Sequence, residues 1–417
     1  MSDIAVESHR QSSHCGDELL SEFVDRLFAH LPRADQRSRS HEYVTGLLVT
    51  PGKKSLRRMA AAVSDSPHTS QALQQFVNVS PWDWRPVRHT LADWVERRRT
   101  TLTWSLGLCV IPKRGERSAG VHRRYATGTD RTVNCQLGIG LFLGSADVCV
   151  PVDWRLVLPG QWQTDEAWRE AARITTDEAA STEGACALDL VRTQWRAAGR
   201  RAAPLVADLT EMPHDPSLLP GLAALGTGFV VRVTGDTAVY PSGGQYGPVA
   251  VSRLLRGTTP GPGSGVVLGP GGRGRSQVRT CGVRLTHGAA EVRRSPCGVI
   301  AEHPAGEQHA PRYFVTDLTH HRPGDVLALA NTMHRTRATV RELQEHGGLL
   351  DFEGRSYPGW HHHMTLVAAA YAFSRLGAQT PVHETPRLVG PLTRPHRARV
   401  PAGTPPRPLR RPEMIPV

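Results

Sequence analysis

Three apolar runs in succession, between residues 101 and 158, constrain the fold of this chain more than any other feature of its sequence. They are TLTWSLGLCV, NCQLGIGLFL and DVCVPVDWRLVL, rich in Val, Leu and Cys and broken by Gly and Asp. Such runs predict β-strands. Helical patterns follow at 164–173 and 183–200, then the short apolar run APLVADLT, a helix near 216–225 and the run GFVVRVT. This order predicts an α/β fold with a mixed sheet and flanking helices.

The segment before these strands, residues 18–99, has the periodicity of an all-helical domain. The stretch DELLSEFVDRLFAHL places its apolar side chains on one face of a helix. Shorter helices are expected around 53–64, 70–78 and 86–99. The change of character at residue 100 therefore predicts a boundary between a helical domain and the α/β domain.

The α/β domain is expected to span residues 100–377 and to contain an insertion. Residues 235–310 are dense in Gly, Pro and Arg, which predicts flexible turns with short strands at 264–268 and 276–286. RYFVTDL then returns to a strand, and two or three helices complete the domain. The Pro- and Arg-rich tail, residues 378–417, has the composition of a disordered segment.

The charge balance favours a polyanionic partner. The formal net charge is +12, and all but three of the basic residues are arginines. An excess of this size is typical of nucleic-acid binding, and arginine forks onto phosphates well, although a basic enzyme with no such role remains the alternative. Two clusters in the helical region are candidate DNA contacts: Lys53, Lys54, Arg57, Arg58, Arg97, Arg98 and Arg99.

Other classes of protein fit the composition less well. No apolar run is long enough to span a membrane, and the first residues lack a signal-peptide pattern, so we expect a cytoplasmic protein that does not bind membranes. The seven cysteines contain no CxxC pair, which favours free thiols in a reducing compartment.

The segment LQEHGGLLDFEGRSYPGWHHHM, residues 343–364, is rich in residue types that bind metals. Three adjacent histidines, His361, His362 and His363, cannot converge on one ion, because consecutive helical residues point about 100° apart. We expect instead the N-terminus of a helix, with polar residues in its first turn and an apolar stripe that enters a core.

Four segments carry a resemblance to a known family. They are HRRYATGTDRTVNCQLGI, WRLVLPGQWQTDEAWREAA, LVADLTEM and LLDFEGRSYPGWHHH, in this order along the chain. With them the chain resembles the DDE transposases of bacterial insertion sequences, in the group with a C-terminal DFEGR-x-x-x-GWHHH segment. The resemblance implies a ribonuclease H-like mixed sheet with flanking helices. It also implies a double-stranded DNA partner, a bacterial nucleoid-associated location and a homodimer as the candidate assembly.

The catalytic chemistry of this family uses three carboxylates that hold two divalent metal ions. By the resemblance, the three positions in this chain are Gly107, Asp208 and Arg337, so the acidic triad is degenerate. Asp208 is the one acid that remains, and it fits either a metal ligand or a cap of a strand end. An arginine at the third position would repel Mg²⁺.

The main hypothesis is therefore a transposase-like DNA-binding protein that cannot cleave DNA and needs no cofactor, either with a new role or as a decayed copy. The first alternative is an active, Mg²⁺-dependent transposase in which nearby acids such as Glu342 or Glu345 replace the missing ones. The second alternative is a ribonuclease H-like scaffold that binds other proteins.

Overall fold

The computed structural model places five strands in the order β4–β3–β1–β5–β6 at the centre of one sheet. β3 pairs antiparallel with both β4 and β1, whereas β5 pairs parallel with β1 and β6 pairs parallel with β5. Their bounds are β1 (Thr103–Pro112), β3 (Arg131–Gly144), β4 (Cys149–Leu156), β5 (Leu205–Asp208) and β6 (Phe229–Val233). This is a ribonuclease H-like mixed sheet, so the predicted fold class is confirmed.

The structure describes residues 16–126, 131–175, 182–198, 203–210, 212, 215–242, 247–257, 259, 261–268, 275–285, 296–304 and 310–379. All of them belong to one compact unit that spans residues 1–382. The tail predicted to be disordered, 378–417, lies almost wholly outside the described residues.

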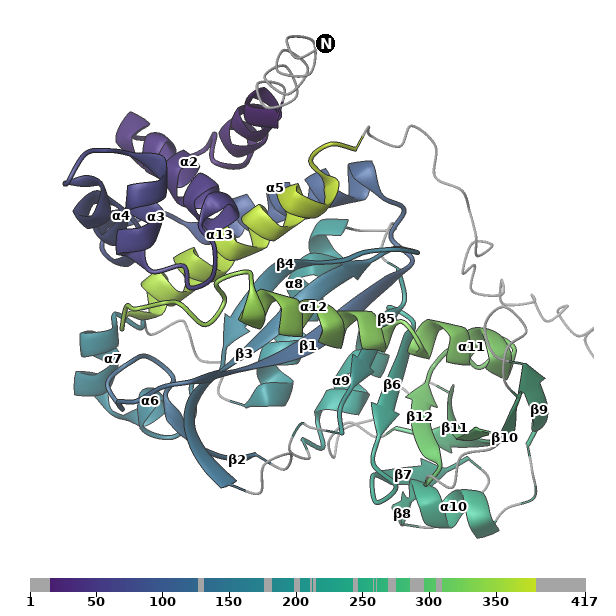
Figure 1. The fold of residues 1–417 in the computed structure, drawn as a ribbon. Helices are drawn as coiled ribbons and strands as arrows, with labels where there is room; N and C mark the ends of the chain where they lie inside the picture. The colour runs from purple at the N-terminus through teal and green to yellow at the C-terminus, as the bar shows by residue number, and fades with distance from the viewer. Residues whose placement is uncertain are drawn as a thin grey trace, which may run out of the picture. The chain divides into compact units, whose positions relative to one another are not determined.

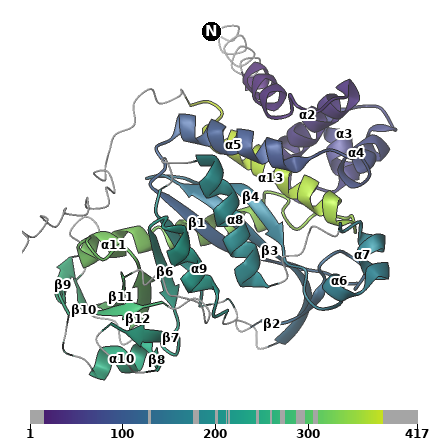
Figure 2. The ribbon, with the colours of Figure 1, turned by 180° about the vertical axis from the view of Figure 1, so that it is seen from behind.

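Helices cover both faces of the sheet (Figures 1 and 2). On one face lie α12 (Met333–Glu345) and α13 (Tyr357–Leu376), and on the other lie α8 (Glu183–Ala198) and α9 (Leu218–Leu225). The apolar strands require this arrangement, since successive side chains point to opposite faces and both sets are buried.

The insertion predicted at 235–310 extends the same sheet beyond β6. β12 pairs with β6, and β11, β10, β7 and β8 follow in antiparallel order, while β9 pairs with β10. The bounds are β7 (Ala238–Pro241), β8 (Val249–Ala250), α10 (Val251–Gly257), β9 (Gly265–Leu268), β10 (Arg275–Arg284), β11 (Pro296–Pro304) and β12 (Arg312–Thr316). The sequence did not predict β11, because its short apolar core is flanked by prolines.

The N-terminal region is helical in the structure, over residues 16–27 and in four further helices. These are α2 (Ala34–Val49), α3 (Leu56–Val63), α4 (Thr69–Asn78) and α5 (Trp84–Arg98). Their buried side chains belong to the same hydrophobic core as those of α13 and of the sheet. The change at residue 100 is thus a change of secondary structure within one core.

Three smaller elements complete the description: β2 (His122–Ala126), α6 (Gln161–Thr164) and α7 (Glu166–Ala172), with α11 (Pro323–Ala330) leading into α12. The helix expected at 164–173 is present as α7, which begins two residues later. Asp165 is its N-cap, because its side chain accepts a hydrogen bond from the backbone N–H of Trp168. The sequence did not predict the short helix α6 before it.

Candidate functional site

Asp208 lies at the carboxyl end of β5, where two other elements bring basic side chains to it. Arg232 comes from the neighbouring parallel strand β6, directly opposite Asp208 in register. Arg337 comes from α12, which packs on this face of β1 and β5. Successive side chains of a strand point to opposite faces of the sheet. Ala207 and Val231 belong to the core on the face opposite α12, so the next residues, Asp208 and Arg232, point to the α12 face.

The carboxylate of Asp208 accepts four hydrogen bonds. Its Oδ2 accepts from Arg337 Nη2 at 2.7 Å and from Arg232 Nη1 at 3.1 Å. Its Oδ1 accepts from the backbone N–H of Thr210 at 3.0 Å and from the Thr210 hydroxyl at 2.5 Å. The side chain of Asp208 is 11% exposed, against 34% for Arg232 and 47% for Arg337. One acid therefore faces two cations, and the cluster carries a net positive charge.

Gly107 lies beside this cluster on β1. Leu106 pairs with Ala207 in the parallel ladder, so Gly107 and Asp208 are the next residues on their strands. A Cβ atom at Gly107 would lie 2.8 Å from the Phe142 ring, 2.9 Å from the Thr336 methyl group and 3.3 Å from Val340. The space that an acidic side chain at position 107 would need is therefore filled by side chains of β3 and α12.

Polar contacts fix α12 on the sheet at this point. The hydroxyls of Thr336 and Ser105 are 2.6 Å apart, and the Gln344 amide donates to the carbonyl of Val110 at 3.2 Å. Both contacts lie on the β1 side of the helix, on either side of Val340, which packs near Gly107. These two hydrogen bonds hold α12 on β1, and they fix the position from which Arg337 reaches Asp208.

The two acids considered as replacements, Glu342 and Glu345, do not join the cluster. Glu342 accepts a hydrogen bond from the Tyr371 hydroxyl at 3.1 Å and forms an ion pair with Arg375, both on α13. Glu345 is about half exposed at the end of α12, with the His346 ring 3.9 Å from its carboxylate. The contacts of these two acids are therefore with other residues, and neither carboxylate is placed to bind a metal ion together with Asp208.

A divalent metal does not fit this set of side chains. Mg²⁺ prefers several carboxylate and carbonyl oxygens, and here one carboxylate is already neutralised by two guanidinium groups. Within the described ranges, no group of three or more His, Cys, Asp or Glu side chains could hold a metal ion. Arg232 was not among the predicted site residues, although an arginine within the apolar run GFVVRVT is a signal for one.

The burial of Lys54 weighs against its predicted role as a DNA contact. Its side chain is buried, with 6% of the residue exposed, and its ammonium group donates to the carbonyl of Thr50. Its backbone N–H donates to Asp351 Oδ2 at 2.7 Å. Lys54 thus joins the end of α2 to the segment before α13, and its charge cannot reach a phosphate in this conformation.

The other residues of the first basic cluster are exposed. Arg57 and Arg58 lie on α3, and Lys53 precedes it with its ammonium 3.9 Å from Glu353. In the second cluster, at the end of α5, only Arg97 is exposed. Figures 1 and 2 show α3 and the end of α5 at separate places.

Two arginines of the second cluster have contacts within the protein. Arg98 lies over the ring of Trp94, with its guanidinium carbon 3.9 Å from the ring centroid, and burial lowers its pKa. Arg99 Nη2 is 3.2 Å from Asp147 Oδ2. Arg97 is therefore the better candidate for an intermolecular contact.

The three histidines lie in the second turn of α13, and the expectation of polar residues in its first turn is wrong. The helix begins at Tyr357, and the Ser356 hydroxyl accepts a hydrogen bond from the backbone N–H of Gly359 as its N-cap. All three imidazoles are buried, with at most 1% of each residue exposed.

Each imidazole points in a different direction. His361 Nδ1 accepts from Arg88 Nη2 on α5 at 3.1 Å. His363 Nε2 donates to the carbonyl of Gly348 at 3.0 Å, and its Nδ1 lies 3.0 Å from the Tyr43 hydroxyl on α2. Consecutive histidines therefore reach different helices, as their 100° spacing requires.

His362, between these two in the sequence, contacts a third region of the N-terminal helices. Its ring nitrogens lie 2.9 Å from the carbonyl of Val77 and 2.8 Å from that of Trp82, and the ring stacks on Trp82 at 3.9 Å. A neutral imidazole has one N–H, so it donates to one of these carbonyls at a time. The three histidines hold the N-terminal helices on α13, which is a structural role.

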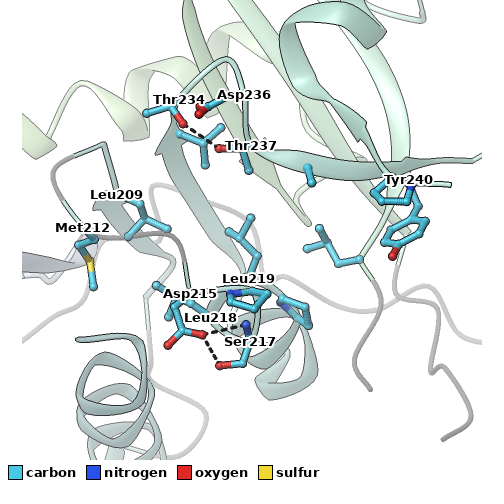
Figure 3. Close-up of a pocket in the computed structure, with 16 residues that line it drawn as sticks. Leu209, Met212, Asp215, Ser217, Leu218, Leu219, Thr234, Asp236, Thr237 and Tyr240 are labelled. Atoms are coloured by element: carbon cyan, nitrogen blue, oxygen red, sulfur yellow. Dashed lines mark hydrogen bonds between the residues drawn. The ribbon is translucent and has the colours of Figure 1, made fainter. Parts of the chain in front are cut away.

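A pocket of about 1020 Å³ lies beside the start of α9, next to the ends of β5 and β6 (Figure 3). Leu209 and Thr234, from just beyond these strands, line it, together with two acids, Asp215 and Asp236. Asp215 accepts hydrogen bonds from the backbone and hydroxyl of Ser217 at the start of α9. The acidic lining makes this pocket unsuitable for a phosphate.

No helix among the described residues combines the length and the apolar character that a membrane span requires.

Comparison with known proteins gives one family match. The family described as "DDE superfamily endonuclease" matches residues 26–284, a range that contains Gly107, Asp208 and Arg232 and ends before α12 and α13. A solved structure, the cryo-EM structure of a piggyBac transposase synaptic complex with hairpin DNA, is similar at a TM-score of 0.41 and 11% identity, over 85% of this chain and 71% of that one. This similarity is too distant to support a functional argument. No curated protein matches the sequence.

Proposed function

Because the chain belongs to the DDE superfamily endonucleases, we propose that it is a transposase-like protein that binds duplex DNA and has lost metal-dependent cleavage. One observation carries the proposal: Asp208 is in ion pairs with both Arg232 and Arg337. A carboxylate that is already paired with two guanidinium groups attracts a divalent cation weakly, and a second cation close to two fixed positive charges is repelled.

The neighbourhood of Asp208 supports the same proposal. Gly107 has no room for an acid, and Glu342 is held by α13. Strand transfer in this superfamily requires two metals that activate a nucleophile and stabilise the leaving oxygen. With one carboxylate in the cluster, neither task has the ligands that it needs.

The proposed DNA binding rests on the family and on the charge of +12. Neutralised phosphates release counterions, so log K should fall with log salt by about 0.9 for each contact. A titration of a fluorescent duplex between about 50 and 200 mM salt therefore measures the number of contacts. A flat response, or no binding at low salt, would count against DNA as the partner and favour a protein-binding scaffold.

The loss of cleavage is tested with the purified chain and supercoiled plasmid in Mg²⁺ or Mn²⁺. We expect no nicking, and calorimetry should detect no Mn²⁺ binding that depends on Asp208. Asp208→Asn is the matched variant, since it removes the charge and keeps the shape. Nicking that requires metal and disappears in Asp208→Asn would overturn the proposal in favour of an active transposase with unorthodox acids.

A further inference from the structure

The cluster of Arg232, Asp208 and Arg337 places positive charge where the family chemistry would place metal ions. Both arginines bond the same oxygen of Asp208, so their guanidinium groups converge from a strand and a helix onto one point. Each side chain keeps a third to a half of its surface exposed. An anion that approaches from solvent meets both groups together.

The surrounding charges reinforce this positive potential. Arg341 is exposed on α12 one turn after Arg337, and side chains at this spacing lie on the same side of a helix. Of the two acids of α12, Glu342 pairs with Arg375 on α13, and Glu345 lies at the end of the helix beside His346. Asp208 contributes one negative charge, and it is the least exposed member of the cluster.

We propose that Arg232 and Arg337 form a metal-independent site for a phosphodiester phosphate of duplex DNA, with Asp208 as the residue that positions the two guanidinium groups. The inference rests on the proposed DNA binding and adds the site to it. Guanidinium groups match phosphate oxygens in two-pronged hydrogen bonds, and they need no cofactor to be charged. Positive charge that two metals would supply for catalysis is supplied here by side chains, which can hold a phosphate and cannot activate water.

The test measures binding of a short fluorescent duplex in the presence of EDTA. The double variant Arg232→Gln/Arg337→Gln should bind at least about tenfold more weakly, and its salt slope should be smaller by about 1.8, which corresponds to two phosphate contacts. Arg256→Gln on α10 is the matched control, since it removes one exposed arginine from the far end of the sheet. Circular dichroism and the unfolding temperature establish that each variant is folded.

The sign of one further variant separates the proposed site from a metal site. Asp208→Asn removes the negative charge from the cluster and keeps a side-chain oxygen that accepts hydrogen bonds from the guanidinium groups, so it should strengthen binding in EDTA by a few-fold. If Asp208 were a metal ligand, the same change would leave binding in EDTA unaltered and weaken binding in Mg²⁺. Weaker binding only in Mg²⁺ would overturn the inference.

Free phosphate provides the last arm. Inorganic phosphate, compared with chloride at matched ionic strength, should raise the unfolding temperature of the wild-type chain more than that of the double variant. If phosphate raises the two unfolding temperatures equally and the double variant binds DNA as tightly as the wild type, the proposed phosphate site is wrong. The proposed function as a DNA-binding protein is then unaffected. If the wild-type chain binds no duplex at all, the proposed function fails, and the site fails with it.

Discussion

Arg337 Nη2 lies 2.7 Å from Asp208 Oδ2, and this contact joins α12 to the end of β5. Residues 129 positions apart in the chain thus form an ion pair. The resemblance to DDE transposases assigns both positions to acids, which would repel each other without metal ions between them. In this chain an attraction replaces the repulsion, so the site is stable without metal.

Gly107→Ala should lower the free energy of unfolding by about 1–3 kcal/mol, since the new methyl group would press on the Phe142 ring and on Thr336. Urea denaturation measures the change. Gly115→Ala is the control, because nothing lies within 4 Å of a Cβ atom there. Equal stabilities of the two variants would show that the core beside Gly107 has room to adapt. The expected cost also means that Gly107→Asp would not by itself restore the acid that the resemblance places at this position.

Arg88→Met should lower the free energy of unfolding by about 3–5 kcal/mol, because it removes one partner of a buried ion pair. Arg88 Nη1 is 2.8 Å from Asp153 Oδ1, and both side chains are almost fully buried. The comparison is Arg99→Met, which removes a partly exposed ion pair with Asp147 and should cost about 1 kcal/mol or less. A cost for Arg88→Met as small as that for Arg99→Met would contradict the structural importance of the buried pair.

Stability should decrease as the pH falls from about 6.5 to about 4. Burial lowers the pKa of His362 and of His363 to about 4, and it lowers the pKa of His361 well below 6.5. In this window the unfolded chain binds protons that the folded chain does not, so each histidine reduces the stability by up to about 1.4 kcal/mol per pH unit. Above a pH of about 6.5 the three histidines are neutral in both the folded and the unfolded chain, so they no longer reduce the stability.

Urea unfolding of His362→Gln at several pH values in this window provides the measurement. The variant should have a smaller pH slope than the wild type, whatever its stability at neutral pH. His346→Gln, which changes an exposed histidine, should keep the wild-type slope. An unchanged slope in His362→Gln would mean that this imidazole is protonated in the folded chain, as its two carbonyl neighbours would favour.

Lys54 and Arg57 should behave in opposite ways when they are replaced. Lys54→Met should lower the unfolding temperature and leave the salt slope of DNA binding unchanged, since its ammonium group is buried against the end of α2. Arg57→Gln should keep the unfolding temperature and reduce the slope by about 1, as the loss of one phosphate contact predicts. A reduced slope in Lys54→Met would show that the lysine leaves its buried position to bind DNA.

Local patterns predicted the strands between 101 and 158 and the N-terminal helices well, because alternation and helical periodicity are properties of neighbouring residues. These patterns did not predict the ends of helices that a single capping side chain determines. Asp165 ends one helix and starts another, and Ser356 starts α13 several residues earlier than the apolar stripe indicates. β11 has too short an apolar core to be recognised without its partner strands.

The sequence by itself determined the fold class, the family and the positions to examine, because each of these depends on the order and type of residues along the chain. Only the tertiary structure decided what those positions do. The pairing of Asp208 with Arg232 and Arg337, the filled space at Gly107 and the burial of Lys54 all depend on which distant segments meet. The three histidines show the same division. They are adjacent in the sequence, but their partners on other helices are 273 to 320 residues away, and contacts at that separation exist only after the core has formed.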